Sequence, residues 1–440
     1  MIISLLFVTP FMVSDEIYNG VIMAKEFWFF GVVALMLLYS AIQMLIKKDK
    51  LRIEFNLVDI LLLAFYTWCF IRAIFTPYTP FYYNHKLQIL TGMMIVYFFV
   101  KNAIRNENYE GKNYSFIPSF IHSLIPKPFI ISFLIFSFIL SGFLQAIYGL
   151  LQLYGIYPSY NSYFKITGSF FNPAPYAMYL AVVFPVALGQ MLMKNERIKN
   201  EGIKKYSFIF SFLNSFTQKY LPIATVIAII LVLPATMNRA SWLGALAGSL
   251  VVLQYKYSWL QQIKNWLNTR TKKIMGITFS VLLVCGIGLS LFYMKAGSSN
   301  GRMFIWEVTL GKIAEKPLFG HGLGRFEAEY NNWQAEYFMK HPEDTNSMRF
   351  ADNTRYSFNE YFEILVETGI PGLLLLLIVI ITTFLLVRSK SANISILAFS
   401  LLSVVVCAAI SFPFYSLPTF FVFFALLALI SSSRGTEIKK

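Results

Sequence analysis

Two arginine-containing motifs carry the residue types in this sequence that are best suited to chemistry. Residues 238–244 (NRASWLG) contain Arg239, and residues 301–306 (GRMFIW) place Arg302 beside a flexible glycine. A guanidinium group has a planar fork of donors, which can bind the oxygens of an anion in a bidentate manner and offset charge that develops on it. The structural alternative for Arg239, next to Trp242, is an anchor at a membrane surface.

Two further motifs combine polar residues and glycines. Residues 167–173 (TGSFFNP) end in Asn172 and a proline, a pair that would also cap and start any helix. Residues 320–326 (GHGLGRF) are rich in glycine, but no apolar strand precedes them, so the pattern gives little support for phosphate binding. Residues 343–344 are adjacent carboxylates rather than an alternating pair, and no His or Cys cluster is present. The sequence therefore predicts no metal site.

Composition identifies the elements that must position these motifs. The chain has 440 residues, of which 57% are hydrophobic and 13% are charged, about half the roughly 25% charged residues of soluble proteins. Its apolar residues form continuous blocks near the ~20 residues that a helix needs to cross a bilayer, unlike the short alternating strands of an outer-membrane barrel. Soluble enzymes, secreted enzymes and single-span receptors are excluded. The sequence predicts an all-α, polytopic membrane protein.

About twelve transmembrane helices are predicted. The apolar segments are 2–13, 22–46, 55–75, 86–100, 128–153, 173–193, 220–237, 241–255, 274–294, 362–387, 392–412 and 417–431. The first of them contains Pro10 and rises only about 18 Å, so whether it spans the bilayer is open. Cys69, Cys285 and Cys407 all lie inside these segments, which favours packing over a disulfide or a thiolate metal site.

The net charge of +15 indicates topology rather than binding of nucleic acid. The short loops and span ends on one side of the membrane contain 5 Lys and Arg residues. The loops on the other side contain 24, and they are 47–54, 101–127, 194–219, 256–273, 388–390 and 434–440. Because loops rich in Lys and Arg stay in the cytoplasm, both termini are expected there. The motifs of Arg239 and Arg302 are then expected on the periplasmic face.

One long polar segment, about 295–361, interrupts the apolar spans. It contains, or is directly followed by, 11 of the 22 acidic residues, with a helical pattern around 303–316 and many aromatic residues in 326–338. Because most connections in compact domains are far shorter, we expect a small periplasmic lid, and a solvated cap without chemistry is the alternative. The predicted organisation is one membrane domain, with helices one to nine in 1–294, the lid in 295–361, and helices ten to twelve with a cytoplasmic tail in 362–440.

In their order along the chain, these motifs resemble those of the O-antigen ligase and O-antigen polymerase family. The resemblance rests on residues 167–172, 238–244, 301–306, 320–326 and 359–372. That family also includes bacterial protein O-oligosaccharyltransferases, and its members are metal-independent glycosyltransferases of the GT-C type in the bacterial inner membrane. They transfer a glycan from undecaprenyl diphosphate to an acceptor hydroxyl on the periplasmic side. The resemblance implies the same activity, location and partners here, with no cofactor.

The resemblance also assigns roles to residues. Arg239 and Arg302 would bind the diphosphate and stabilise the charge that develops when the bond between sugar and diphosphate breaks. Further substrate contacts are expected from five residues on the periplasmic face, which are Asn172, Asn359, Lys25, Arg72 and Lys86. For the two lysines and the arginine among them, snorkelling to the membrane surface is the alternative.

The chain departs from the family pattern at one position. Before Asn359 and Glu360 the family usually has a histidine that is tied to acceptor activation or phosphate contact, whereas this chain has Phe358. Either Glu360 is the catalytic base, or stabilisation of the leaving group carries most of the reaction, or the acceptor is of a different type. The structural alternative for Glu360 is an acidic residue in the first turn of a helix.

A polysaccharide or lipid flippase is the alternative from a different class. It would also be basic and cross the membrane many times, but a transporter is expected to carry ionisable residues at mid-span depth or broken helices in paired halves. Here the span interiors are nearly free of charge, and the polar residues are concentrated in one insertion. The sequence therefore favours a transferase. It does not identify the acceptor, which is a glycolipid, a lipid-linked repeat unit or a protein.

Overall fold

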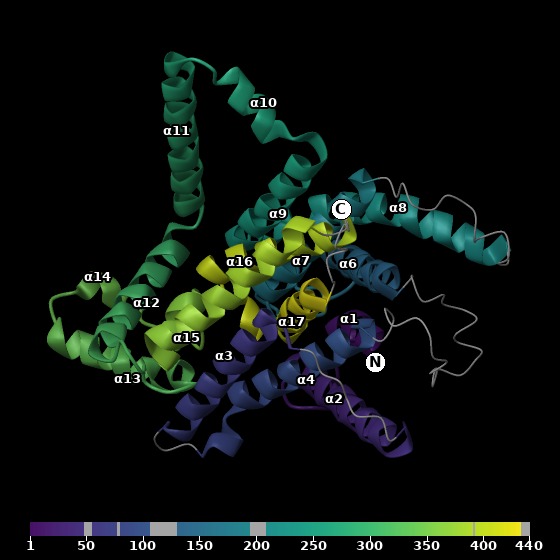
Figure 1. The fold of residues 1–440 in the computed structure, drawn as a ribbon. Helices are drawn as coiled ribbons and strands as arrows, with labels where there is room; N and C mark the ends of the chain where they lie inside the picture. Colours follow the sequence, from purple (N-terminus) through teal and green to yellow (C-terminus); the bar gives the residue numbers. More distant parts are fainter. Residues whose placement is uncertain (48–54, 77–79, 106–129, 194–207, 390–391, 433–440) are drawn as a thin grey trace.

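The computed structural model describes residues 1–47, 55–76, 80–105, 130–193, 208–389 and 392–432. It is 80% helical, and the described residues contain no strand (Figure 1). The all-α class is confirmed, and the helices fit a polytopic membrane protein.

Nine helices in the described part of the chain are long and apolar enough to cross a membrane. They are α2 (Gly20–Lys47), α3 (Leu57–Ile74), α4 (His85–Arg105), α6 (Ile130–Leu153), α7 (Pro173–Leu192), α8 (Phe208–Val232), α11 (Arg270–Met294), α15 (Glu360–Leu385) and α16 (Ala392–Ile410). Each of them corresponds to one of the twelve predicted segments.

The other three predicted segments are also helical but differ in length or polarity. α1 (Ile2–Phe7) is followed by the short η1 (Thr9–Phe11), and α17 (Leu417–Ser432) has 16 residues. A helix of that length rises about 24 Å, which is less than the ~30 Å of a bilayer core. α9 (Arg239–Tyr257) is longer but contains several polar residues. The exact number of twelve spans therefore stays a prediction.

One face of α9 is buried in the bundle and carries the small and polar residues, including Ser241 and Ser249, whereas Leu246 and Leu250 are exposed. The helix packs between α7 and α16, and its glycines allow the close approach. A Cβ atom at Gly244 would lie 2.5 Å from the sulfur of Cys407, and one at Gly248 would clash with Ser403. Small residues at a helix interface let two backbones come together without lipid between them. The helix that begins at Arg239 is thereby held firmly in the protein interior.

α11 stands apart from this bundle. Its side chains are exposed along the span, and it packs mainly against α12 (Ala296–Glu315) at its end (Figure 1). An apolar helix without protein neighbours is expected to be surrounded by lipid. α12 therefore begins at the end of a helix that is exposed along its span.

The insertion between α11 and α15 is folded. It consists of α12, α13 (Arg325–Lys340) and the short α14 (Thr345–Met348). Phe304 and Val308 of α12 pack with Phe326 and Trp333 of α13 in a small apolar core, which Val366 of α15 completes. The predicted helical pattern and the aromatic segment correspond to α12 and α13. Its function as a lid stays a prediction.

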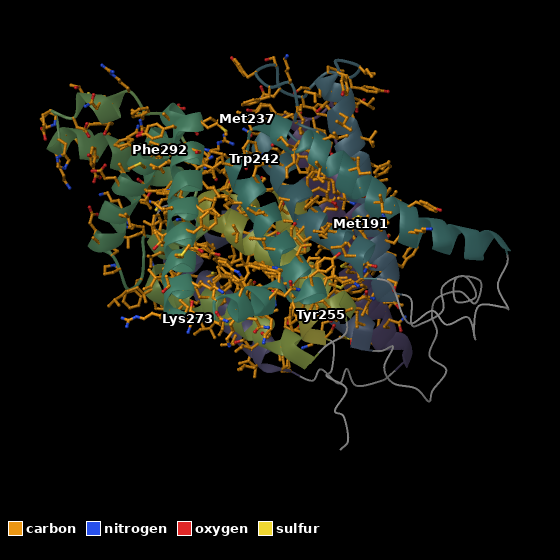
Figure 2. The ribbon with its side chains drawn as sticks, turned by 90° about the horizontal axis from the view of Figure 1, so that it is seen from above. Met191, Met237, Trp242, Tyr255, Lys273 and Phe292 are labelled. Carbon is orange, nitrogen blue, oxygen red and sulfur yellow. The ribbon has the colours of Figure 1, made fainter. Side chains whose placement is uncertain are left out.

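The N-terminal end of α9 and the C-terminal end of α11 lie at the same end of the molecule (Figure 2). Figure 2 shows Met237, Trp242 and Phe292 at one end, and Tyr255 and Lys273 at the other. The predicted cytoplasmic segments 47–54, 101–127, 194–219 and 434–440 lie wholly or mostly outside the described residues. The assignment of the Arg239 end to the periplasm therefore stays a prediction.

Candidate functional site

Arg239 is fixed at the N-terminus of α9 by the helix cap. The side chain of Asn238 accepts a hydrogen bond from the backbone N–H of Ser241 at 2.9 Å, so Arg239 is the first helical residue. Its Nη1 donates to the hydroxyl of Ser299 at 2.6 Å and to the carbonyl of Leu291 at 2.5 Å. Because Ser299 lies in the first turns of α12, Arg239 is held against the start of the insertion.

Arg302 reaches the same place from α12. It follows Ser299 by three residues, and residues at this spacing share one helix face. Its Nη1 donates to the carbonyl of Ile410 at 2.8 Å, and its guanidinium carbon lies 4.7 Å from the centroid of the Phe358 ring. Its Nε is buried without a hydrogen-bond partner. The structure thus brings the two predicted arginines together from separate parts of the chain.

Among the described residues, the two guanidinium groups have no carboxylate partner. Neither takes part in an ion pair with the described residues. Burial, together with repulsion by Arg239, lowers the pKa of Arg302 to about 10. A cation that is desolvated and repelled by a second cation gains free energy when an anion arrives. The pair is therefore suited to bind a group that carries at least two negative charges.

A third cation, Lys295, lies next to the two arginines and was missed by the sequence analysis. It immediately follows α11, and its Nζ donates to the carbonyl of Met237 at 3.0 Å. Partial desolvation and repulsion by Arg239 and Arg302 lower the pKa of Lys295. The signal in the sequence was the spacing of Lys295, Ser299 and Arg302, at positions i, i+4 and i+7, which places them on one helix face.

An aromatic wall, formed by Tyr356, Phe358 and Phe412, lies beside Arg302. The rings of Tyr356 and Phe412 stack with their centroids 4.1 Å apart, and Phe358 meets Phe412 edge-on at 5.3 Å. Phe358 has a φ of 54°, a conformation that is rare for a bulky residue and costs roughly 1–3 kcal/mol. Asn359 caps α15 and so fixes the chain directly after Phe358. The surroundings thus hold the ring of Phe358 against Arg302.

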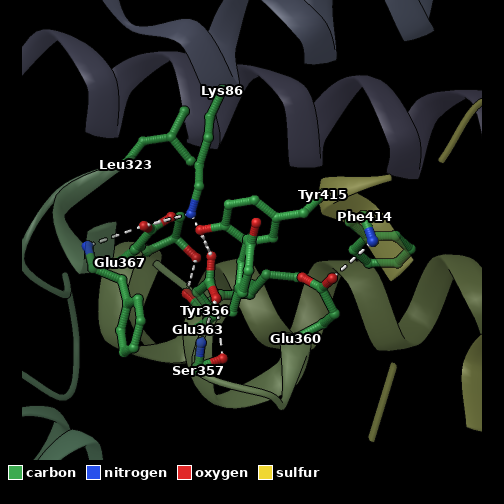
Figure 3. Close-up of polar contacts among 12 residues, drawn as sticks. Lys86, Leu323, Tyr356, Ser357, Glu360, Glu363, Glu367, Phe414 and Tyr415 are labelled. Carbon is green, nitrogen blue, oxygen red and sulfur yellow. Dashed lines mark hydrogen bonds and ion pairs between the residues drawn. The ribbon is translucent and has the colours of Figure 1, made fainter. Parts of the chain in front are cut away.

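A glutamate cluster, formed by Glu360, Glu363 and Glu367, occupies the first turns of α15 next to the aromatic wall (Figure 3). All three side chains are buried. Lys86 of α4 forms ion pairs with Glu363 and, at 2.7 Å, with Glu367. Burial and the nearby glutamates raise the pKa of Tyr415, so its hydroxyl stays protonated and donates to Glu363 at 2.5 Å. Lys86 is therefore already neutralised by protein carboxylates.

Glu360 differs from its two neighbours in its contacts. Its Oε1 accepts a hydrogen bond from the backbone N–H of Phe414 at 2.7 Å (Figure 3). No hydrogen bond from the described residues reaches its Oε2. Glu360 also follows Phe358 by only two residues. One carboxylate oxygen of Glu360 therefore has no hydrogen-bond partner among the described residues.

The part of the chain that holds the two arginines and the glutamate cluster matches a known family. Residues 224–377, about a third of the chain, match the family model of O-antigen ligases. This part of the chain is similar to the O-antigen ligases. The family predicted from the motifs is thereby confirmed for this segment. A search of curated proteins found no match to the chain.

The O-antigen ligase segment contains no arrangement of ligands for a metal. Among its described residues, and in the rest of the described chain, no group of three or more His, Cys, Asp or Glu side chains could hold a metal ion.

Two of the predicted substrate contacts, Lys25 and Asn172, lie outside the O-antigen ligase segment and make other interactions. Lys25 Nζ donates to the carbonyls of Met12, Val21 and Ser169 at 2.7–2.8 Å. Asn172 caps α7 by accepting from the N–H of Ala174. These two residues organise the loop of residues 167–173.

Arg72 and Asn359 are the remaining predicted contacts. Arg72 Nη2 donates weakly to the carbonyl of Gly320 at 3.4 Å, and its Nε is buried without a partner. The side-chain oxygen of Asn359 accepts from two N–H groups at the start of α15. The structure thus places neither residue in contact with Arg239 or Arg302, and their roles in substrate binding stay predictions.

The glycine-rich motif of residues 320–326 attaches the insertion to α15. The N–H groups of His321 and Gly322 donate to the carbonyls of Val366 and Glu367 at 2.7 and 2.9 Å. The glycine at position 320 has a positive φ, and a Cβ atom there would lie 2.5 Å from the Glu367 backbone. These amides are occupied within the protein and are not free to bind a phosphate.

The contacts of Lys86 predict a structural role. Replacing it by Met leaves Glu363 and Glu367 buried without their cation, and breaking a buried pair in this way costs about 3 kcal/mol or more. We expect a cost in the free energy of unfolding of about 3 kcal/mol, because the Lys86 side chain is 23% exposed and partly hydrated. We expect a clear fall in the midpoint of thermal unfolding in detergent, which Glu367→Gln in the same chain should partly restore, whereas Lys340→Met should have no effect. Normal stability combined with lost transfer would instead assign Lys86 to the substrate.

Proposed function

We propose that the protein transfers a glycan from undecaprenyl diphosphate to an acceptor hydroxyl, as an O-antigen ligase or polymerase of the bacterial inner membrane. The observation that carries this proposal is that Arg239 and Arg302 meet, with no carboxylate partner among the described residues, inside a segment that matches the O-antigen ligases. A diphosphate carries at least two negative charges and offers several oxygens to guanidinium donors. The membrane helices around the site suit a substrate with a polyprenyl chain.

The proposed reaction is a displacement at the anomeric carbon of the glycan. The acceptor oxygen forms a bond to that carbon, and the bond between the carbon and the diphosphate oxygen breaks. The electron pair of the broken bond stays on the diphosphate, where Arg239 and Arg302 stabilise the added charge. The proton of the acceptor hydroxyl passes to the free Oε2 of Glu360. No metal ion or cofactor is needed for this balance.

We place the reaction on the periplasmic side, and the distribution of Lys and Arg supports this orientation. The folded insertion next to Arg302 then serves as the lid. Labelling of a cysteine introduced at Asn331 with a membrane-impermeant reagent should succeed from the periplasm. If the label reaches this position only from the cytoplasm, the site lies on the side of the membrane opposite to the donor's glycan. That result would overturn the proposal.

A flippase is less favoured by the distribution of charge. The ionisable residues near the site belong to the first turns of α4, α12 and α15 and to the start of α9. A transported charged substrate would require ionisable or polar groups further along its path through the membrane.

The experiment that tests the function uses the purified protein in liposomes that contain a lipid-linked oligosaccharide. Lipid A core, a second lipid-linked oligosaccharide and a protein are offered as separate acceptors. We expect release of undecaprenyl diphosphate and glycosylation of one acceptor. Movement of the donor across the bilayer with no release of undecaprenyl diphosphate would identify a flippase instead.

A further inference from the structure

Lys295 connects the lipid-facing helix to the arginine pair. It comes directly after Met294, the last residue of α11, a helix exposed along its span. Its Nζ contacts the carbonyl of Met237, two residues before Arg239. Its backbone carbonyl accepts from the N–H and the hydroxyl of Ser299, the residue that binds Arg239. Lys295 and Arg239 are therefore held together around one serine.

Lys295 has the accessibility and the charge that an anion ligand needs. Its side chain is exposed, and it forms no ion pair with the described residues. The one hydrogen bond of its ammonium group goes to a neutral carbonyl, which leaves two of its three donors for a ligand. With Arg239 and Arg302 it makes a group of three cations on neutral supports. An anion whose negative charge is comparable in magnitude to the positive charge of this group would stabilise it by reducing the repulsion between the cations.

Lys295 and Arg302 lie at different heights along α12, with Lys295 at its N-cap. Lys295 lies at the bilayer end, beside α11, and Arg302 follows after seven residues, or about 10 Å of helix. Arg302 is the cation that contacts the ring of Phe358 in the aromatic wall. Flat apolar faces of sugar rings pack well on aromatic rings, and Glu360 lies two residues beyond Phe358. The lipid end of a donor would thus lie near α11, and its sugar end near the aromatic wall.

We propose that Lys295 is a further ligand of the donor, binding the phosphate that carries the lipid, while Arg302 binds the phosphate that carries the sugar. Arg239, between them, contacts both. This inference rests on the proposed function and gives the donor an orientation, with its polyprenyl chain beside α11 and its sugar against the aromatic wall. In this orientation, the bond between the sugar and the diphosphate, which breaks in the reaction, lies next to Glu360.

Binding of farnesyl phosphate and farnesyl diphosphate to the full-length protein in detergent tests this orientation. The monophosphate represents only the lipid-linked phosphate. We expect Lys295→Met to weaken both ligands about tenfold, as the loss of one charge-assisted hydrogen bond predicts, and Lys295→Arg to bind both within about twofold of the wild type. Arg302→Lys should weaken the diphosphate about tenfold and leave the monophosphate nearly unchanged. Lys316→Met, at the other end of α12, is the matched control.

Each other outcome has a distinct meaning. If Lys295→Met and Lys295→Gln bind both ligands normally while Arg302→Lys loses the diphosphate, Lys295 is only a membrane anchor, and the proposed function survives. If Arg302→Lys loses the monophosphate and Lys295→Met does not, the orientation is reversed. If Arg239→Lys and Arg302→Lys also bind both ligands normally, the diphosphate site itself is absent and the proposed function falls. Thermal unfolding of each variant separates lost binding from lost folding.

Discussion

Replacing Arg302 by lysine is expected to reduce the rate of glycan transfer about 10²–10³-fold, the usual effect of removing one preorganised donor from developing negative charge. Lysine keeps the positive charge and the ability to snorkel, but it loses the planar fork. The structure supports a specific role for this guanidinium, because it lies over the Phe358 ring and its Nε has no hydrogen-bond partner among the described residues. Arg239→Lys should have an effect of the same order. Release of undecaprenyl diphosphate measures the rate.

The controls for the arginine variants are expression, thermal stability and a distant substitution. Arg355 is an exposed residue of the insertion whose partner is Glu327, so Arg355→Lys should transfer at the wild-type rate. The wild-type reaction should also survive chelation by EDTA, since the arginines supply the positive charge. Wild-type rates in both lysine variants would reduce Arg239 and Arg302 to membrane anchors. Inhibition by EDTA that added magnesium reverses would contradict the mechanism without a metal.

Glu360→Gln is expected to reduce transfer roughly 10²–10⁴-fold, the contribution of a positioned general base. Glutamine has the same size, and its carbonyl oxygen can still accept the hydrogen bond from Phe414. What the variant loses is the oxygen that takes the proton of the acceptor. The rate should therefore fall while the affinity for farnesyl diphosphate stays the same. Single-turnover transfer, measured beside ligand binding, separates the two quantities.

The Phe358 position offers a complementary test of Glu360. Histidine is among the residues that adopt a positive φ more readily, so Phe358→His should fold. Activity regained by adding Phe358→His to Glu360→Gln would mean that either residue can serve as the base from this side of the site. Glu327→Gln, on the exposed face of α13, is the control and should transfer normally. A loss below tenfold in Glu360→Gln would leave Glu360 as a first-turn residue of α15, with catalysis carried by the arginines.

The sequence determined the helices and their approximate bounds. Continuous apolar blocks near the length of a bilayer crossing can form only helices that satisfy their own backbone in lipid. The motifs around Arg239 and Arg302 indicated the family and pointed to two arginines that the structure then brings together. The change in composition at 295 marked the insertion, and its helical pattern matched α12. These features are local, so a pattern of neighbouring residues is enough to reveal them.

Tertiary structure decided which charges meet. Lys86 appeared in the sequence as a free cation at a span end, but the fold brings its side chain to Glu363 and Glu367 of α15. Lys295 looked like a loop residue until Ser299 placed it beside Arg239. The glycine-rich motif of residues 320–326 contacts α15, because the amides of His321 and Gly322 donate to carbonyls 45 residues further along the chain. Partners of charges and amides come from distant segments, and only the packing of the helices brings those segments together.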